Sequence, residues 1–174
     1  MTAAEHPPVH LAFAAQARRT PDAVAVEAGG VPVAYAALDA RAGALAARLS
    51  ALGVGPETRV GVCMERSAEM VAALLAVLRA GGAYVPLDPA YPAERLAYML
   101  ADSAVPVLLT QERLRDRLPE FGGEVVACDG TPLPPAPSPA RGEGEHDGAE
   151  ESTAVAGCSL FPVPCSLAYV IYTS

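Results

Sequence analysis

The stretch LRAGGAYVPLDPAYPAERLAYMLADS, residues 78–103, holds the most information about the fold. It begins at the end of an apolar helical segment. Its double glycine, Gly81-Gly82, predicts that this helix stops there, because glycine is favoured just past a helix C-terminus. The run AYVPL that follows is typical of a short strand. Pro92 is expected to open the next helix, where its missing N–H costs nothing. Helix, strand and helix therefore follow one another within one short stretch.

The same alternation continues toward the N-terminus. Segment 35–53 predicts a helix whose apolar side chains, spaced three and four residues apart, lie on one stripe, and Gly53 is expected to end it. The stripe of segment 35–53 comprises Tyr35, Leu38, Ala42, Leu45, Leu49 and Leu52. Ser67 is expected to cap the helix that follows. The expected elements are a helix at 9–19, two strands around Gly29-Gly30 within 23–35, the helix at 35–53, a strand at 59–64 and a helix at 67–82.

Toward the C-terminus the pattern predicts further strands. Leu96, Met99 and Leu100 fall on one face of the helix that Pro92 opens. Strands that alternate with helices imply βαβ units and a mostly parallel sheet, and continuous apolar strands such as VPVLL fit a sheet covered on both faces. The predicted fold class is α/β, a mostly parallel sheet with helices on both faces. The remaining expected elements are a strand at 105–110, a short charged helix at 111–118 and a strand at 124–129.

Polar residues after the strand AYVPL allow two interpretations. Asp88 fits the first position of a turn before Pro89, and contact with a ligand is the alternative. Glu94 and Arg95 stand near a helix start and are expected to be solvated or paired locally. We expect most of residues 78–103 to be scaffold.

Composition divides the chain into three parts. Residues 9–129 are patterned and globular, whereas residues 130–165 are rich in proline, glycine and acidic side chains and are expected to form a flexible linker or insertion. The pattern returns in residues 166–174, where LAYVIYTS predicts a strand that leads into a loop of small hydroxyl residues. Ligands of parallel sheets bind beyond the carboxyl ends of strands, which is where the final Tyr-Thr-Ser would stand.

Charge excludes several classes of function. The 174 residues carry a net charge of −8, and every basic residue is arginine. An acidic chain without a basic cluster is a poor partner for nucleic acid or an anionic membrane. The start of the chain lacks the features of a signal peptide, and the longest apolar run, MVAALLAVL, is too short to span a membrane. We expect a cytoplasmic protein with reduced thiols.

Cysteine and histidine spacing predicts neither a metal site nor a catalytic centre. The closest cysteines, Cys158 and Cys165, are farther apart than the paired ligands of zinc sites. Cys63 and Cys128 are expected to be small buried thiols. The three histidines are scattered, without a partner at usable spacing.

At this point a family resemblance emerges. Residues 78–103 resemble the second signature motif of the amino-acid adenylation domains of nonribosomal peptide synthetases, and AGGAYVPLDPAYPAERL is its specific part. LAYVIYTS, residues 167–174, resembles the first half of that family's phosphate-binding loop, YTSG(S/T)TGxPKG. TPDAVAV resembles the usual start of such domains. VAYAALDARAGALAARL resembles the first motif, LTYxELxxxAxxLAxxL, but departs from it at Ala34 and Ala37.

The resemblance implies a reaction. An amino-acid carboxylate attacks the α-phosphorus of ATP, which gives an aminoacyl-adenylate and pyrophosphate, and the acyl group then passes to the phosphopantetheine thiol of a carrier protein. ATP and Mg²⁺ are the implied cofactors. Thr173 and Ser174 are implied to lie beside the ATP phosphates, where small residues let backbone N–H groups approach closely. No catalytic residue and no metal ligand is assigned.

The same resemblance implies an incomplete site. The loop lysine, the amino-acid pocket and the small C-terminal domain would all follow Ser174, so the chain is expected to be an incomplete part of the large N-terminal subdomain. We expect it to be inactive alone and to bind neither ATP nor Mg²⁺ tightly. One alternative is half of a split enzyme that needs a complementing partner chain. Another is an unrelated nucleotide-binding module, although neither GxGxxG nor GxxxxGK(S/T) is present.

Overall fold

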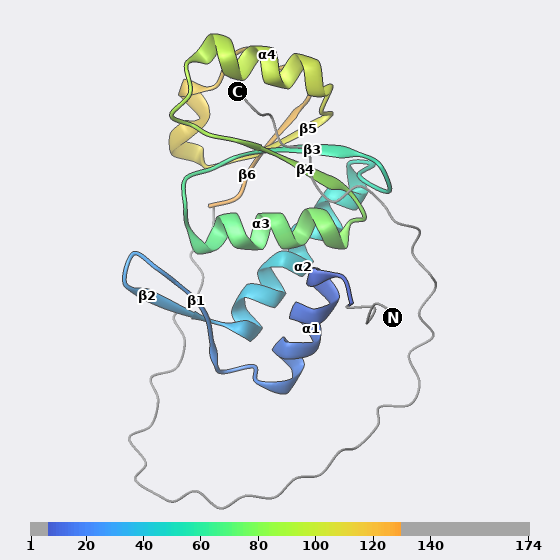
Figure 1. Ribbon diagram of the computed structural model, residues 1–174, viewed down its shortest axis with the longest axis vertical. Helices are drawn as coiled ribbons and strands as arrows, with labels where there is room; N and C mark the ends of the chain where they lie inside the picture. The colour runs from blue at the N-terminus through green and yellow to red at the C-terminus, as the bar shows by residue number, and fades with distance from the viewer. Residues whose placement is uncertain (1–6, 130–174) are drawn as a thin grey trace, which may run out of the picture.

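A computed structural model of the chain describes residues 7–129, and residues 1–6 and 130–174 lie outside the description. The described part holds a helical N-terminal half and a sheet-containing half (Figure 1). The elements are α1 (Val9–Arg19), β1 (Val24–Ala28), β2 (Val31–Ala34), α2 (Tyr35–Ala51), β3 (Arg59–Cys63), α3 (Ala68–Arg79), β4 (Ala83–Leu87), α4 (Ala93–Ser103), β5 (Val107–Thr110), the 3₁₀ helix η1 (Glu112–Arg117) and β6 (Glu124–Ala127).

Four of the strands form one parallel sheet in the order β4-β3-β5-β6. β3 pairs with β4 on one side and with β5 on the other, and β5 pairs with β6. Parallel strands need crossover connections, and here these are α3, α4 and η1. The chain therefore passes from β3 out to β4 and back across to β5, which puts a change of winding direction between β3 and β5.

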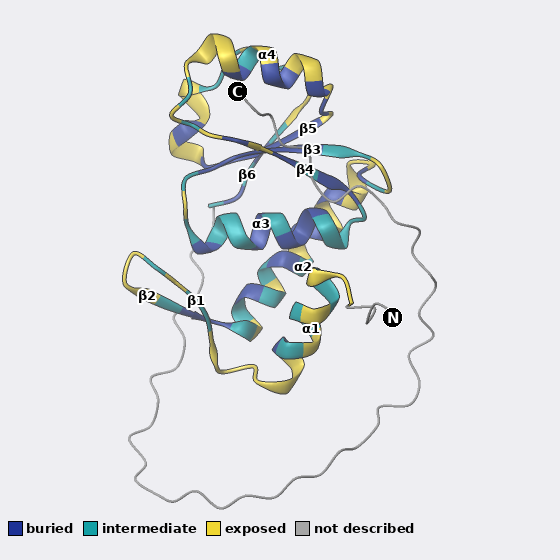
Figure 2. Cartoon of the chain, viewed as in Figure 1, coloured by how far each residue is buried: buried dark blue, intermediate teal, exposed yellow. Residues whose placement is uncertain are grey.

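Helices cover both faces of this sheet. α3 lies on one face and α4 on the other (Figure 1), and α2 packs against α3. Side chains alternate between the two faces along each strand, as the pleat requires. Val60, Val62, Leu109 and Val126 join the core on the α3 side, whereas Val85, Leu87 and Leu108 join the core under α4. Buried residues concentrate along the strands and the helix faces turned to them (Figure 2). The predicted α/β fold class is confirmed.

The N-terminal half is built from α1, the β1–β2 hairpin and α2. Gly29 and Gly30 form the hairpin turn with φ of 60° and 77°, a left-handed conformation that favours glycine, as predicted. The predicted stripe of α2 is buried at Leu38, Ala42, Leu45 and Leu49. Leu52, the last residue of the predicted stripe, caps the C-terminus of α2 and is 40% exposed.

Helix ends follow the predicted signals closely. Gly53 and Gly81 adopt φ of 85° and 84° just past α2 and α3. Ser67 Oγ accepts the N–H of Met70 at 3.2 Å and caps α3. Pro92 stands one residue before α4, in the capping position, and its carbonyl accepts the N–H of Leu96 at 3.1 Å. The charged segment after β5 is a 3₁₀ helix, tighter than an α-helix, as is common for short connections.

Several predictions fall on residues that the structure does not describe. The linker at 130–165, the strand at 166–174 and the candidate phosphate contacts Thr173 and Ser174 all lie outside residues 7–129. Within the described range, none of the helices combines the length and apolar character that a bilayer crossing requires.

Candidate functional site

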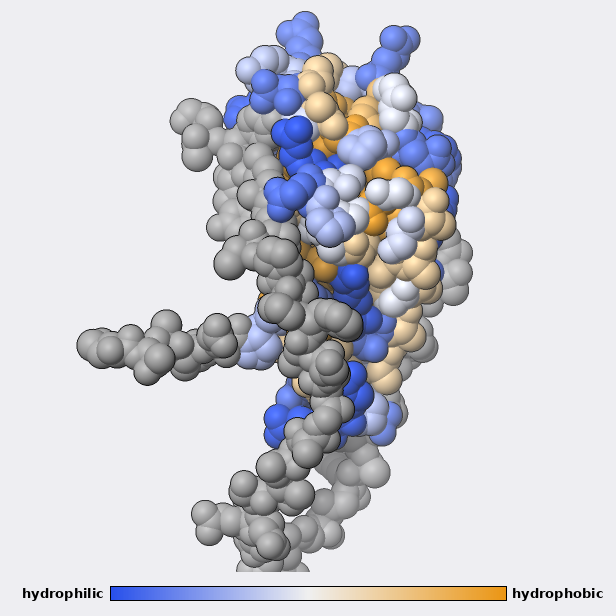
Figure 3. Space-filling model, turned by 90° about the vertical axis from the view of Figure 1, so that its right-hand side faces the viewer, coloured by the Kyte–Doolittle hydropathy of each residue, from blue (hydrophilic) through white to orange (hydrophobic). Residues whose placement is uncertain are grey.

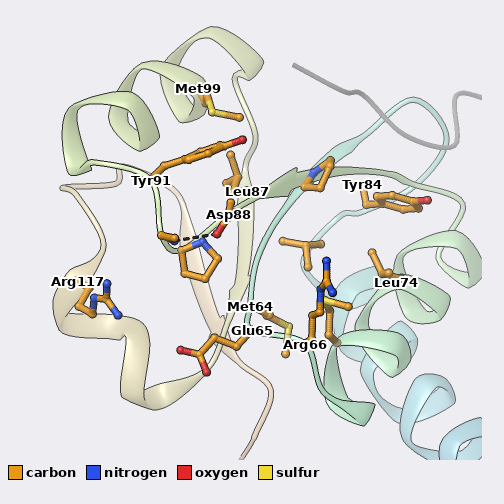
Figure 4. A pocket seen from close by; sticks show the side chains of 15 residues that line it. Met64, Glu65, Arg66, Leu74, Tyr84, Leu87, Asp88, Tyr91, Met99 and Arg117 are labelled. Atoms are coloured by element: carbon orange, nitrogen blue, oxygen red, sulfur yellow. Dashed lines mark hydrogen bonds between the residues drawn. The ribbon is translucent and has the colours of Figure 1, made fainter. Parts of the chain in front are cut away.

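The main hollow of the described chain lies at the carboxyl ends of β3 and β4. It is a cleft of about 610 Å³ with an apolar floor and a charged rim. In Figure 4, Tyr91 and Met99 border one side and Tyr84 and Leu74 the other, and Glu65 and Arg117 lie below Tyr91 in the view. This is the edge at which parallel sheets bind ligands. The floor and walls comprise Val62, Met64, Met70, Leu74, Tyr84, Pro86, Leu87, Tyr91 and Met99.

Asp88 shapes the rim of the cleft. Its Oδ1 accepts the backbone N–H of Ala90 at 2.9 Å, and its carbonyl accepts the N–H of Tyr91 at 3.0 Å. These bonds confirm the predicted turn after β4. The Arg95 guanidinium lies over the Tyr91 ring, 4.2 Å from its centroid, so Arg95 is paired locally as predicted. Glu94 is exposed.

Two buried polar side chains, at the end of β5 and just past it, fasten the loop that lines the cleft. Thr110 Oγ1 donates to the carbonyl of Cys63, the last residue of β3, at 2.9 Å. Gln111 Oε1 accepts the N–H of Glu65 at 3.0 Å, and its Nε2 donates to Ser67 Oγ at 3.4 Å. Thr110 and Gln111 are 0% and 3% exposed, so the Thr110 bond is shielded from water and the two Gln111 bonds are shielded in part. The β3–α3 loop is thus held in place by the neighbouring strand.

A similar tie joins β6 to β5. Both carboxylate oxygens of Asp129 accept the N–H of Glu112, at 2.9 and 3.0 Å. An exposed ion pair, Arg113 to Glu65 at 2.6 Å, spans the same edge. Polar residues at the end of β5 therefore anchor the loop that follows β3. Asp129, just past β6, anchors the segment that follows β5. Sequence reasoning missed these residues. A polar residue directly after an apolar strand was the signal available for them.

Neither of the two described cysteines is an activated nucleophile. Burial raises the pKa of the Cys63 thiol to about 11, and the Asp88 carboxylate adds to the effect. Burial also raises the pKa of Cys128 to about 11. Both thiols are protonated at neutral pH and suit the predicted role of small core side chains. Burial and the nearby Arg79 guanidinium lower the pKa of His10, which lies on α1 and does not line the cleft.

The described residues also contain no group of three or more histidine, cysteine or acidic side chains placed to hold a metal ion. The rim of the cleft mixes acidic and basic residues, with Glu65 and Asp88 beside Arg66 and Arg117. The cleft can accordingly bind and position a partner.

A parallel α/β sheet with a hollow beyond its strand ends is the architecture of many nucleotide-binding enzymes. The sequence profile of one such family, described as AMP-binding enzyme, matches residues 13–174. The chain belongs to the AMP-binding enzyme family. Within that family it is similar to the N-terminal part of the adenylation domains of nonribosomal peptide synthetases.

Curated relatives agree with this assignment. One of the linear gramicidin synthase proteins of Brevibacillus parabrevis is 47% identical over 168 residues, covering 95% of this chain and 2% of that protein. One of the plipastatin synthase proteins of Bacillus subtilis (strain 168) is 46% identical over 170 residues, covering 98% of this chain and 6% of that protein. The chain thus spans a small fraction of the length of these relatives.

Solved structures share the fold. The nonribosomal peptide synthetase FmoA3, in its alpha-methyl-L-serine-AMP bound form, is 43% identical with a TM-score of 0.69, covering 74% of this chain and 15% of that chain. A four-domain nonribosomal peptide synthetase bound to AMP and glycine is 30% identical with a TM-score of 0.66, covering 75% of this chain and 10% of that one.

Proposed function

We propose that this chain supplies the N-terminal part of an enzyme that activates an amino acid with ATP and loads it on the phosphopantetheine arm of a carrier protein. The supporting observation is a family match that extends through Ser174, on a fold whose strand ends form a cleft. In this proposal the chain alone is inactive, because the sequence has no lysine and therefore lacks the loop lysine that the resemblance implies.

Thr173 and Ser174 are the residues proposed to contact the ATP phosphates, through hydroxyl groups and backbone N–H groups. ATP would supply the adenylyl group and a pyrophosphate leaving group. Mg²⁺ would balance phosphate charge, and no described cluster fits it as a resident metal. The described residues 7–129 hold the scaffold that fixes the strand ends around the cleft.

A chimera tests this function. Residues 13–174 would replace the matching segment of FmoA3, which has been solved with an adenylate of alpha-methyl-L-serine. We expect the chimera to catalyse alpha-methyl-L-serine-dependent exchange between pyrophosphate and ATP, and the isolated chain to catalyse none. A folded chimera without exchange contradicts the proposal. Exchange by the isolated chain contradicts the proposed incompleteness.

Point variants in the chimera separate folding from phosphate contact. Thr173→Ala and Ser174→Ala are expected to lower kcat by about tenfold or more, as loss of a donor to a developing charge does. Ser166→Ala, in the same region but outside the phosphate-binding motif, is the matched control and should leave kcat unchanged. Equal effects of all three variants would contradict a specific phosphate role.

A further inference from the structure

The cleft at the carboxyl ends of β3 and β4 has the size and lining of a small-molecule site. Its volume of about 610 Å³ lies within the range of about 300–1,000 Å³ that is usual for ligand pockets. All three methionines of residues 7–129 and two tyrosine rings line it. They are Met64, Met70, Met99, Tyr84 and Tyr91. Methionine adapts its shape to a ligand and its sulfur contacts aromatic rings favourably, so this lining favours a flat aromatic body.

The two acidic side chains at the rim of the cleft are already engaged. Glu65 pairs with Arg113 at 2.6 Å, and Arg113 does not line the cleft. Asp88 Oδ1 accepts the N–H of Ala90 at 2.9 Å in the turn after β4. Each carboxylate therefore has a partner before any ligand enters.

The two basic side chains at the rim are in the opposite state. Among the residues that the structure describes, neither Arg66 nor Arg117 has an ion pair or a hydrogen-bond partner for its side chain. The two arginines lie on either side of Glu65 in Figure 4. A guanidinium offers five N–H donors in a fixed fork that matches the geometry of an oxyanion. The rim thus holds unused positive charge in a chain whose net charge is −8.

We propose that this cleft binds an aromatic compound that carries one negative charge. The rings lie against the methionines and Tyr84, and the charged group binds Arg66 or Arg117. The rim selects the sign of the charge, and the apolar floor selects the rings. A nucleotide fits less well, because its ribose hydroxyls and base edges would lose water against the apolar floor without finding partners. The site is argued from the cleft alone and does not rest on the proposed function.

Two fluorescent probes with the same aromatic rings test the site on the full chain. Anilinonaphthalene sulfonate carries the negative charge, and phenylnaphthylamine is its uncharged counterpart. We expect one molecule of the sulfonate to bind per chain, with a Kd on the order of 10 μM. If the sulfonate shows no saturable binding to the folded chain, the cleft is not open to such a ligand and the proposal is overturned.

Arginine variants test the role of charge. Arg66→Gln with Arg117→Gln is expected to weaken binding of the sulfonate by about five- to tenfold and that of phenylnaphthylamine by less than about twofold. Arg18→Gln with Arg19→Gln, at the exposed end of α1, makes the same change in net charge and is the matched control. The control should change neither affinity. Equal weakening of the sulfonate by both double variants overturns the proposal, because the net charge of the chain would then be the cause.

Leucine variants on α3 test the place of the rings. Leu74 lines the cleft and Leu78, one turn further along, does not, and both are partly buried. Leu74→Glu puts a carboxylate into the apolar wall and is expected to weaken both probes by about tenfold or more. Leu78→Glu is the control and should leave both affinities within about twofold. Urea denaturation shows that each variant is folded. Equal effects of the two variants place the probes elsewhere and overturn the proposal.

Competition with AMP separates this ligand from a nucleotide. We expect a large excess of AMP to leave the fluorescence of the bound sulfonate unchanged. Displacement by AMP overturns the proposal and assigns the cleft to the nucleotide. None of these measurements uses catalytic activity, so their failure is distinct from failure of the pyrophosphate exchange assay.

Discussion

Gly82 and Gly43 show how differently two glycines depend on their surroundings. A Cβ at Gly82 would lie 2.9 Å from the Thr58 carbonyl oxygen and 2.9 Å from Val54 Cγ1. At Gly43, inside α2, the nearest atom would be Arg79 Nη1 at an ordinary 3.6 Å. The first glycine is required by close approach of the backbone. The second is tolerated in a helix that would accept alanine.

We predict opposite effects of alanine at these positions. Gly82→Ala is expected to lower the free energy of unfolding by about 1–3 kcal/mol, because a backbone oxygen cannot move aside easily. Gly43→Ala is expected to raise it by about 0.5–1 kcal/mol through helix propensity. Urea denaturation measures both. Equal effects of the two substitutions would contradict the packing described around Gly82.

The buried thiols predict a stability that falls in alkali. Cys63 and Cys128 have pKa values of about 11 in the folded chain, against 9.0 for an ordinary thiol. The unfolded chain therefore loses these protons first, so their contribution to stability is full below pH 9 and is lost as the pH rises toward 11. A two-unit shift corresponds to roughly 2–3 kcal/mol per thiol at most.

Urea denaturation on either side of the thiol range, at about pH 8 and about pH 10.5, measures this loss. The variant with both Cys63→Ala and Cys128→Ala is expected to lose less stability over the same interval. Comparing the two proteins removes the contribution of every other group, because both proteins share it. If the variant and the original chain lose stability equally, the thiols are not the cause.

At the scale of elements, the ties from β5 to β3 are the interactions that shape the cleft. Gln111→Leu leaves the partly buried Glu65 N–H without its acceptor, and we predict a loss of about 1–3 kcal/mol with faster hydrogen exchange at Glu65. Arg115→Gln breaks the exposed ion pair to Glu112, which makes no contact with Glu65, and is the matched control, expected to cost less than about 1 kcal/mol. A larger effect of the control would contradict this order.

Element positions were predictable because their signals are local. The turn glycines, the Ser67 cap and the apolar stripe of α2 each act over a short stretch of chain. The roles of Thr110 and Gln111 were not predictable, because they depend on the register between β3 and β5, strands joined through a long connection. The position of Leu52 depended on where the chain turns after α2. The candidate phosphate contacts, Thr173 and Ser174, remain predictions.

At the scale of the whole molecule, the described part has open edges and exposed apolar surface. Figure 3 shows hydrophobic residues gathered in the upper half of one face, with hydrophilic residues around them. Val24 and Val31 of the hairpin are 52% and 47% exposed. Exposed apolar surface and unpaired strand edges favour association.

We predict that the isolated chain associates at high concentration, and that Val24→Lys with Val31→Lys raises its soluble yield. Because both side chains are exposed, the free energy of unfolding should change by no more than about 0.5 kcal/mol. Light scattering and soluble yield measure the first effect, and urea denaturation measures the second. Val33→Lys, at a buried position of the same hairpin, should instead destabilise the chain.

The hydrogen bonds along the carboxyl edge of the sheet also affect the order in which parts of the protein fold during translation. The end of β3 is held by Thr110, which lies 47 residues later, and the loop after β5 is held by Asp129, 17 residues after Glu112. At about 5–20 residues per second, the ribosome takes roughly 2–9 s to make the first of these partners. The end of each strand is therefore fixed only after the next strand of the sheet has been made, and the cleft takes shape after β5 has been synthesised.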